Sequence, residues 1–164
     1  MSFFVTQSAA DTTTTATQPI PVQRMPLSGK AQVMEALKVS IVMPNFGAIA
    51  SAAEAVDNFS LFLSTTSFGT TATTWSEPRV FAGEVRSNTG AFTAAGTYSN
   101  YERNMVEQDL TDGAGHGVLI ATDNIFAQLS SSGTGLTSTA RIKILYRWKN
   151  VSLQEYIGIV QSQQ

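Results

Sequence analysis

The stretch ARIKILYRWKNVSLQEYIGIVQ, residues 140–161, decides the fold class because its first half alternates charged and apolar side chains. Successive side chains of an extended strand point to opposite faces of a sheet. The alternation therefore predicts a strand from Thr139 to Trp148 with one face in the core and one face positively charged. The predicted core face comprises Ile142, Ile144, Tyr146 and Trp148. The charged face comprises Arg141, Lys143, Arg147 and Lys149, interrupted by Leu145.

The same alternation recurs upstream. EALKVSIVM, residues 35–43, has Leu37, Val39, Ile41 and Met43 on one face, and DNFSLFLS, residues 57–64, has Phe59, Leu61 and Leu63 on one face. Further strands are predicted over residues 79–86, 118–122, 125–130 and 153–160, with Gly-, Ser- and Thr-rich turns between them. Seven or eight short antiparallel strands of this kind are typical of a single all-β sandwich or barrel, which we place over residues 30–164.

Residues 1–29 differ in composition from the rest of the chain. They are rich in Thr and Pro and offer few apolar side chains, so we expect an extended, flexible N-terminal arm. Two interpretations remain open for this arm. It is either a frayed terminus or a segment that becomes ordered against a neighbouring subunit.

Composition restricts the function. Charged residues make up 13% of the chain, about half of the ~25% that is usual, which favours surfaces covered by neighbouring subunits. The net charge of −2 provides no global attraction for nucleic acid or an anionic membrane. The absence of cysteine excludes disulfides and thiolate chemistry. We also expect no signal peptide and no membrane helix.

The most motif-like loop is DGAGHG, residues 112–117. A glycine-rich loop binds phosphate when a helix follows it, but VLIAT after this loop predicts a strand, so a tight turn is the favoured interpretation. His116, the single histidine, has Asp109, Asp112 and Asp123 nearby in sequence, but these acids lack the spacing of a calcium loop. We therefore predict no metal site, no cofactor and no enzymatic activity.

The C-terminal run ILYRWKNVSLQEYIGIVQSQQ, with EQDLTDGAGHGVLIATDNIFAQ before it, resembles capsid (coat) proteins of small circular single-stranded DNA viruses known mainly from environmental sequences. The resemblance implies an eight-stranded jelly roll, a small icosahedral shell of many identical copies, and a location in the virion. Such proteins commonly carry a basic N-terminal arm, whereas residues 1–29 here contain only Arg24. The departure implies that viral single-stranded nucleic acid is at most a weak partner.

Two sets of residues follow as candidate contacts within such a shell. We expect Arg141, Lys143, Arg147 and Lys149 to contact nucleic acid or acids of a neighbouring subunit, with Glu102, Glu107 and Asp109 as candidate partners. We expect the second set to form an edge strand that adds to the sheet of another chain. That inter-subunit strand comprises Leu153, Tyr156, Ile157 and Ile159.

Two other functions remain open from the sequence. One is a β-barrel module that binds single-stranded nucleic acid or glycan, with Trp75, Tyr98 and Tyr101 as loop aromatics beside the basic strand. The other is a filament subunit, in which the rotation between neighbouring copies does not close.

Overall fold

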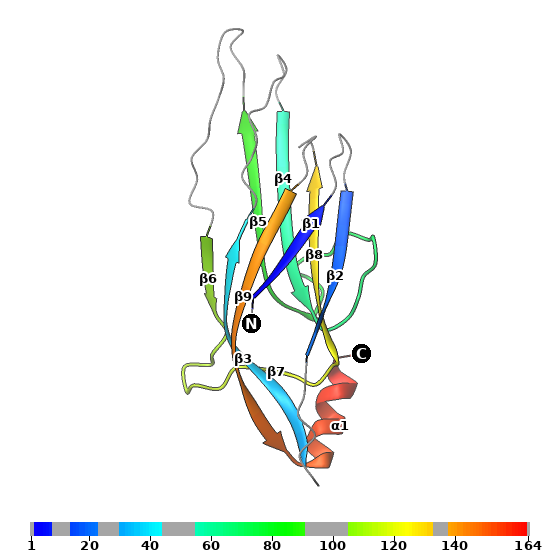
Figure 1. Ribbon diagram of the computed structural model, residues 1–164, viewed down its shortest axis with the longest axis vertical. Helices are drawn as coiled ribbons and strands as arrows, with labels where there is room; N and C mark the ends of the chain where they lie inside the picture. The colour runs from blue at the N-terminus through cyan, green and yellow to red at the C-terminus, as the bar shows by residue number, and fades with distance from the viewer. Residues whose placement is uncertain are drawn as a thin grey trace.

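The computed structural model describes residues 2–7, 14–22, 30–43, 55–90, 105–132 and 138–163. These ranges contain nine strands and one C-terminal helix (Figure 1). The strands are β1 (Ser2–Gln7), β2 (Thr14–Pro21), β3 (Ala31–Val42), β4 (Ala55–Ser64), β5 (Val80–Gly90), β6 (Met105–Asp109), β7 (Val118–Ile120), β8 (Asn124–Ser132) and β9 (Ser138–Val151). The helix α1 comprises Leu153–Ser162.

The strands form two antiparallel sheets. Sheet A has the order β1-β9-β3-β6, with the short β7 also paired to β3, and sheet B has the order β2-β8-β4-β5. The pairs β1–β9, β2–β8, β3–β6 and β4–β5 are nested along the chain and alternate between the sheets. A chain folded over on itself in this way forms a jelly roll. The predicted all-β sandwich with an eight-stranded jelly roll is confirmed, and β7 is an addition to it.

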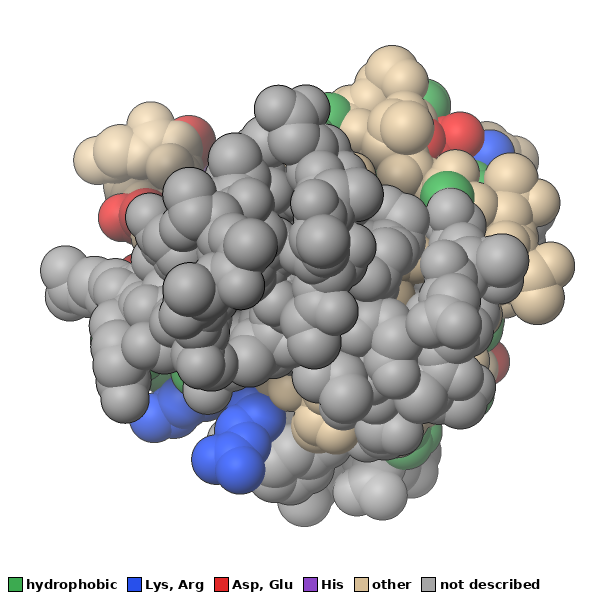
Figure 2. All heavy atoms as spheres, turned by 90° about the horizontal axis from the view of Figure 1, so that it is seen from above, with side chains coloured by type: hydrophobic (Ala, Val, Ile, Leu, Met, Phe, Trp, Pro, Cys, Tyr) green, Lys and Arg blue, Asp and Glu red, His purple; other side chains and the backbone are tan. Residues whose placement is uncertain are grey.

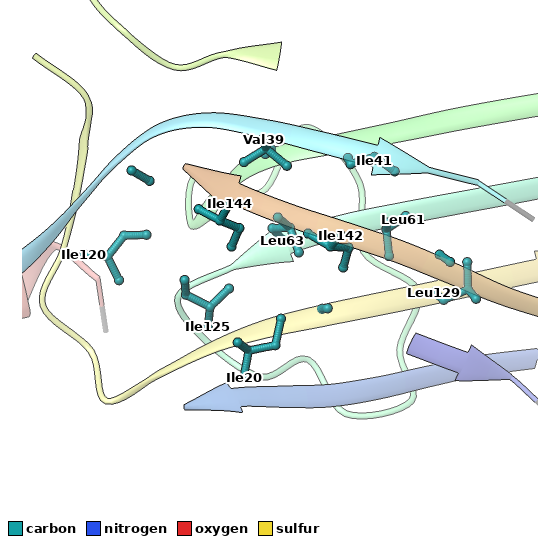
Figure 3. Packing of buried hydrophobic residues seen from close by; sticks show 14 of the residues in the cluster. Ile20, Val39, Ile41, Leu61, Leu63, Ile120, Ile125, Leu129, Ile142 and Ile144 are labelled. Atoms are coloured by element: carbon teal, nitrogen blue, oxygen red, sulfur yellow. The ribbon is translucent and has the colours of Figure 1, made fainter. Parts of the chain in front are cut away.

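The core lies between the two sheets (Figure 3). Its largest side chains include Ile41, Ile142 and Ile144 from sheet A and Leu61, Leu63 and Leu129 from sheet B. Burying each of these stabilises the fold by about 1.5–3 kcal/mol before conformational entropy is subtracted. The predicted core faces of β4 and β9 are therefore confirmed. At the end of the β9 face, the rings of Tyr146 and Trp148 are half-buried and pack edge to face, with centroids 5.5 Å apart.

The predicted core face of β3 is only partly correct. Val39, Ile41 and Met43 are buried as expected, but Leu37 is only half-buried and Ala36 is fully buried. The reason is an irregularity in the pairing with β9 between Ala36 and Lys38, which inserts one residue and changes the face that the strand presents.

Two stretches of the expected arm are strands of the sandwich. β1 pairs with β9, where Ser2 lies opposite Lys143, and β2 pairs with β8, where Thr14 lies opposite Ser131. Ile20 of β2 is part of the core. Residues 2–7 and 14–21 are thus extended, as expected, and each pairs within its own chain. Flexibility of the arm and its contact with a neighbouring subunit remain predictions.

The prediction of a strand over residues 153–160 is wrong, because these residues form α1, and their role between subunits stays a prediction. Ser152 caps the helix by accepting a hydrogen bond from the Glu155 backbone N–H at 3.2 Å. The inner face of the helix, Tyr156, Ile159 and Val160, packs against a small cluster formed by Val33, Ala121 and Val151. These three positions lie on one side of a helix of 3.6 residues per turn, a period that the strand interpretation overlooked.

Three glutamine side chains each bind the backbone of another segment at both an N–H and a C=O. Gln108 of β6 binds both groups of Gly83 in β5. Gln128 of β8 binds Thr71 O at 2.9 Å and Thr73 N at 2.8 Å. Gln163, after α1, accepts from Ala121 N at 2.9 Å and donates to Leu119 O. Each amide thus acts like one peptide group of an additional strand and satisfies backbone groups outside the sheet ladders.

Candidate assembly surfaces

The predicted basic strand lies where the alternation placed it, on the outer face of sheet A. Arg141, Lys143, Leu145 and Arg147 are exposed, and Lys149 is half-buried. In a view onto one end of the sandwich, lysine and arginine side chains protrude at the lower left, and another lies at the upper right (Figure 2). We call Arg141, Lys143, Arg147 and Lys149 the basic stripe. Its members share a face, as predicted, but they do not have equivalent surroundings.

Arg147 is bound within its own chain although 52% of its side chain is exposed. Its Nε donates to the carboxylate of Glu35, which lies directly opposite in β3 and is fully buried. Its Nη2 donates to the carbonyl of Gly115 at 3.0 Å. The guanidinium therefore joins the middle of sheet A to the loop between β6 and β7.

Glu35 is the central acid of this arrangement. Its other carboxylate oxygen accepts the Gly117 backbone N–H at 3.0 Å. The hydrogen bond from Arg147 lowers the pKa of the Glu35 carboxyl, burial opposes this, and the Gly117 N–H lowers the pKa further. The same contact raises the pKa of Arg147. Sequence analysis missed Glu35 because its partner lies 112 residues away and nothing local distinguishes this acid.

The DGAGHG loop is a tight turn, as the favoured interpretation predicted. The Asp112 carboxylate accepts from the backbone N–H of Ala114 at 2.9 Å and of His116 at 3.0 Å, and its other oxygen lies 3.2 Å from His116 Nδ1. Gly113 and Gly115 have φ of 83° and 87°, in the left-handed region that favours glycine. The strand β7 follows the loop, so the helix that a phosphate loop needs is absent from this position.

Two of the three acids proposed as partners of the basic stripe have contacts in their own chain. Glu107 binds Lys38, with 2.6 Å between the carboxylate oxygen and Nζ. Asp109 accepts from both the backbone N–H and the hydroxyl of Thr111. Glu102 lies outside the described residues. Among the residues that the structure describes, no three His, Cys, Asp or Glu side chains are grouped so that they could hold a metal ion.

The four residues of the predicted inter-subunit strand separate onto two faces of α1. Tyr156 and Ile159 face the small cluster on sheet A. Leu153 and Ile157, one helical turn apart, are 69% and 47% exposed. Gln154, Gly158 and Gln161 lie beside this pair and carry no charge. We call these five residues the outer face of α1.

A groove of about 330 Å³ lies on the outer face of sheet B. Phe62, Trp75 and Val85 provide its apolar surface, and Trp75 and Val85 are 53% and 49% exposed. Trp75 packs edge to face on Phe62 with ring centroids 5.3 Å apart. The remaining lining residues are Asn58, Phe59, Ser60, Thr73, Thr74, Ser130 and Ser131, so none of the described residues that line the groove is charged.

The described part of the chain contains no helix with the length and apolar character to cross a membrane.

The sequence matches no family model and no curated protein. The structure, in contrast, is similar to solved structures of VP1 from Trichodysplasia spinulosa-associated polyomavirus. VP1 in complex with sialylated precision glycooligomers superimposes with a TM-score of 0.53 at 10% identity, over 92% of this chain and 93% of that chain. VP1 in complex with GM1 oligosaccharide superimposes with a TM-score of 0.52 at 9% identity, over 93% and 94% of the two chains.

The chain shares its fold with VP1 of this polyomavirus. The jelly roll that the family resemblance implied is thus also the fold of VP1, and the superposition includes nearly all of both chains. An identity of about one residue in ten shows a shared architecture and leaves function to be argued from this chain's own surfaces.

Proposed function

We propose that this chain is a structural subunit that assembles in many copies into a closed viral shell and has no catalytic role. The observation that carries the proposal is the nested jelly-roll strand order, which superimposes on VP1 over more than nine-tenths of both chains. The resemblance of residues 107–164 to capsid proteins of small single-stranded DNA viruses supports a small icosahedral shell.

The surfaces of the subunit support self-assembly. Exposed apolar side chains gather at the outer face of α1 and in the Trp75 groove, while only 13% of the chain is charged. Apolar surface that a single chain leaves open is typical of interaction sites. We therefore propose Leu153 and Ile157 as inter-subunit contacts, in a helix in place of the strand predicted from the sequence.

The basic stripe is proposed as a weak contact with viral single-stranded nucleic acid. Arg147 is already engaged by Glu35 and Gly115, so its charge is partly neutralised within the chain. The other stripe members are Arg141, Lys143 and Lys149, and the charge of Lys149 also lowers the pKa of Glu35. Because the slope of affinity against salt scales with the number of phosphates neutralised, binding should show a shallow salt dependence.

The deciding experiment is negative-stain imaging of the purified full-length protein, with the ratio of absorbance at 260 and 280 nm recorded on the same sample. We expect uniform closed particles. A monodisperse monomer at every salt concentration and pH would refute the proposal. If filaments are seen, the chain self-assembles, but the closed shell is wrong and the arrangement of copies is open. The absorbance ratio then reports whether the particles contain nucleic acid.

A further inference from the structure

We propose that the outer face of α1 from one copy docks into the Trp75 groove of a second copy. Such a contact presupposes the self-assembly proposed above. It is heterologous, since two different surfaces meet, and each copy offers one helix and one groove.

The groove is built to receive apolar side chains. Asn58, Ser60 and Phe62 alternate along β4 with the core residues Phe59, Leu61 and Leu63, so the groove opens on the side of sheet B away from the core. The volume of about 330 Å³ is at the lower end of the range typical of binding pockets. The Thr73 hydroxyl in its wall is buried without a hydrogen-bond partner, so the wall is not fully satisfied within one chain.

The outer face of α1 has the matching shape and chemistry. Leu153 and Ile157 are spaced by four residues, as are the anchors of helices that bind in apolar grooves. Gly158 lies beside them, and a side chain at that position would contact nothing within 4 Å. A bare glycine on the exposed side of a helix lets another chain approach the helix backbone closely.

The absence of charge on both described surfaces favours this pairing over one that involves the basic stripe. Neither the groove nor the outer face of α1 presents a charged side chain. Two charged pairs near the groove in sequence are bound within the chain, Arg86 with Glu84 at 3.5 Å and Arg79 with Glu77 at 2.7 Å. Docking an apolar pair into this groove therefore desolvates no unpaired charge, whereas a lysine or arginine would lose its hydration without a partner.

The contact has to join two copies. The inner face of α1 packs on Val33 of sheet A, and Gln163 binds the backbone beside β7, so the outer face points away from its own sandwich. The groove lies on sheet B. The end of α1 is held further by the Thr66 hydroxyl, which follows β4 and donates to Gln163 O at 2.9 Å. A helix fixed at its inner face and at its end cannot enter the groove on the outer face of sheet B of the same chain.

A charge swap tests the pairing. Ile157→Lys places a charge on the helix and Val85→Glu places one in the groove, and both positions are about half exposed in the single chain. Each variant should fold normally, with an unchanged thermal midpoint, and should raise the protein concentration needed for assembly by at least about tenfold. The double variant Ile157→Lys with Val85→Glu should restore assembly, since the two new charges meet across the contact.

Met105→Lys is the matched control, because Met105 on β6 is 46% exposed, against 47% for Ile157, and lies outside the groove and the helix. It should assemble at the wild-type concentration. Mixing the two single variants should also restore assembly, because an unchanged helix meets an unchanged groove at one contact and the two new charges meet at the next. Light scattering measures the concentration needed for assembly, and analytical ultracentrifugation measures the size of the species formed.

The outcomes separate this contact from the general proposal. A wild-type protein that stays monomeric overturns both. Normal particles from Ile157→Lys or from Val85→Glu overturn the docking and leave the shell intact. If Val85→Glu alone blocks assembly, the groove receives another segment or a small ligand and not α1. If both single variants block assembly and the double variant does not recover, the helix and the groove contact other surfaces.

Discussion

The outer faces of the two sheets differ in what they offer to a partner. Sheet A carries the basic stripe, yet Arg147 is bound to Glu35 and Gly115 although about half of its side chain is exposed. Sheet B presents an uncharged groove in which Trp75 and Val85 have half of their surface in solvent. Exposure of a charged residue is therefore a poor guide to its availability, whereas an exposed aromatic ring in a groove marks surface that the chain leaves uncovered.

The largest expected effect concerns the internal role of Arg147. Arg147→Met removes the partner of a fully buried carboxylate and should lower the free energy of unfolding by about 2–3 kcal/mol, a value already reduced for the solvent exposure of the arginine. Urea unfolding at pH 7 measures it.

The control for this variant is Lys143→Met, four residues earlier on the same face of β9. We expect a change within about 0.5 kcal/mol, as for most surface substitutions. Equal losses from the two variants would contradict the difference that we draw between stripe members.

The loop that rests on sheet A provides the next test. A side-chain carbon at Gly117 would lie 2.1 Å from the carbonyl oxygen of Ala36, which is backbone and cannot move aside easily. Gly117→Ala should therefore destabilise the protein by about 2 kcal/mol through overpacking. Thermal unfolding checks it, and an unchanged midpoint would show that the loop can leave the sheet without cost.

Acid should weaken the Glu35 pairing in sheet A. Because the hydrogen bond from Arg147 lowers the pKa of Glu35 in the folded chain, this carboxylate stabilises the fold fully above its unfolded pKa of about 4.3. The stabilisation is lost as the pH falls from that value through the lower folded pKa. Glu35→Gln should show a flatter stability profile over this interval.

Asp112, whose pKa the backbone N–H of His116 lowers, titrates in the same direction in both proteins. The comparison is therefore the difference between wild type and Glu35→Gln in the free energy of unfolding at successive pH values. A constant difference would exclude Glu35 as a source of acid sensitivity.

The smallest effect concerns α1. Gly158→Ala meets no atom within 4 Å in the single chain and removes a glycine from a helix interior, so it should stabilise the monomer by about 0.5–1 kcal/mol. If the outer face of α1 lies close against a second copy, the same methyl group should weaken assembly. The thermal midpoint of the monomer and the protein concentration needed for assembly should then both rise, and an unchanged or lower assembly concentration would argue against close helix packing.

Local periodicity determined how much of this molecule could be predicted. The alternation in β4 and β9 specifies the buried face because a period of two needs only neighbouring residues. In residues 153–160, Leu153, Ile157 and Ile159 also fit alternation, and the strand interpretation followed them. Ser152 and Glu155 form an S-x-x-E pattern, a helix-start signal that was available in the sequence and was overlooked.

Other features depend on contacts between distant residues. The irregularity in β3 exists only in the pairing with β9, and Glu35 acquires its role from Arg147 and Gly117, which lie far away along the chain. The Trp75 groove gathers residues from three strands and one loop. Sequence analysis named Trp75 as an exposed aromatic, but not the neighbours that give it a concave surface.

The three glutamine amides that bind the backbone affect how the fold responds to pH and salt. A primary amide does not titrate between acid and alkaline pH and carries no charge for salt to screen. Their hydrogen bonds to the backbone should thus be equally stable in acid, in alkali and in concentrated salt. They bind Gly83, Thr71 with Thr73, and Leu119 with Ala121. Their vulnerability is chemical ageing, since hydrolysis of any one amide to a carboxylate leaves two acceptors and no donor where the backbone carbonyl needs an N–H.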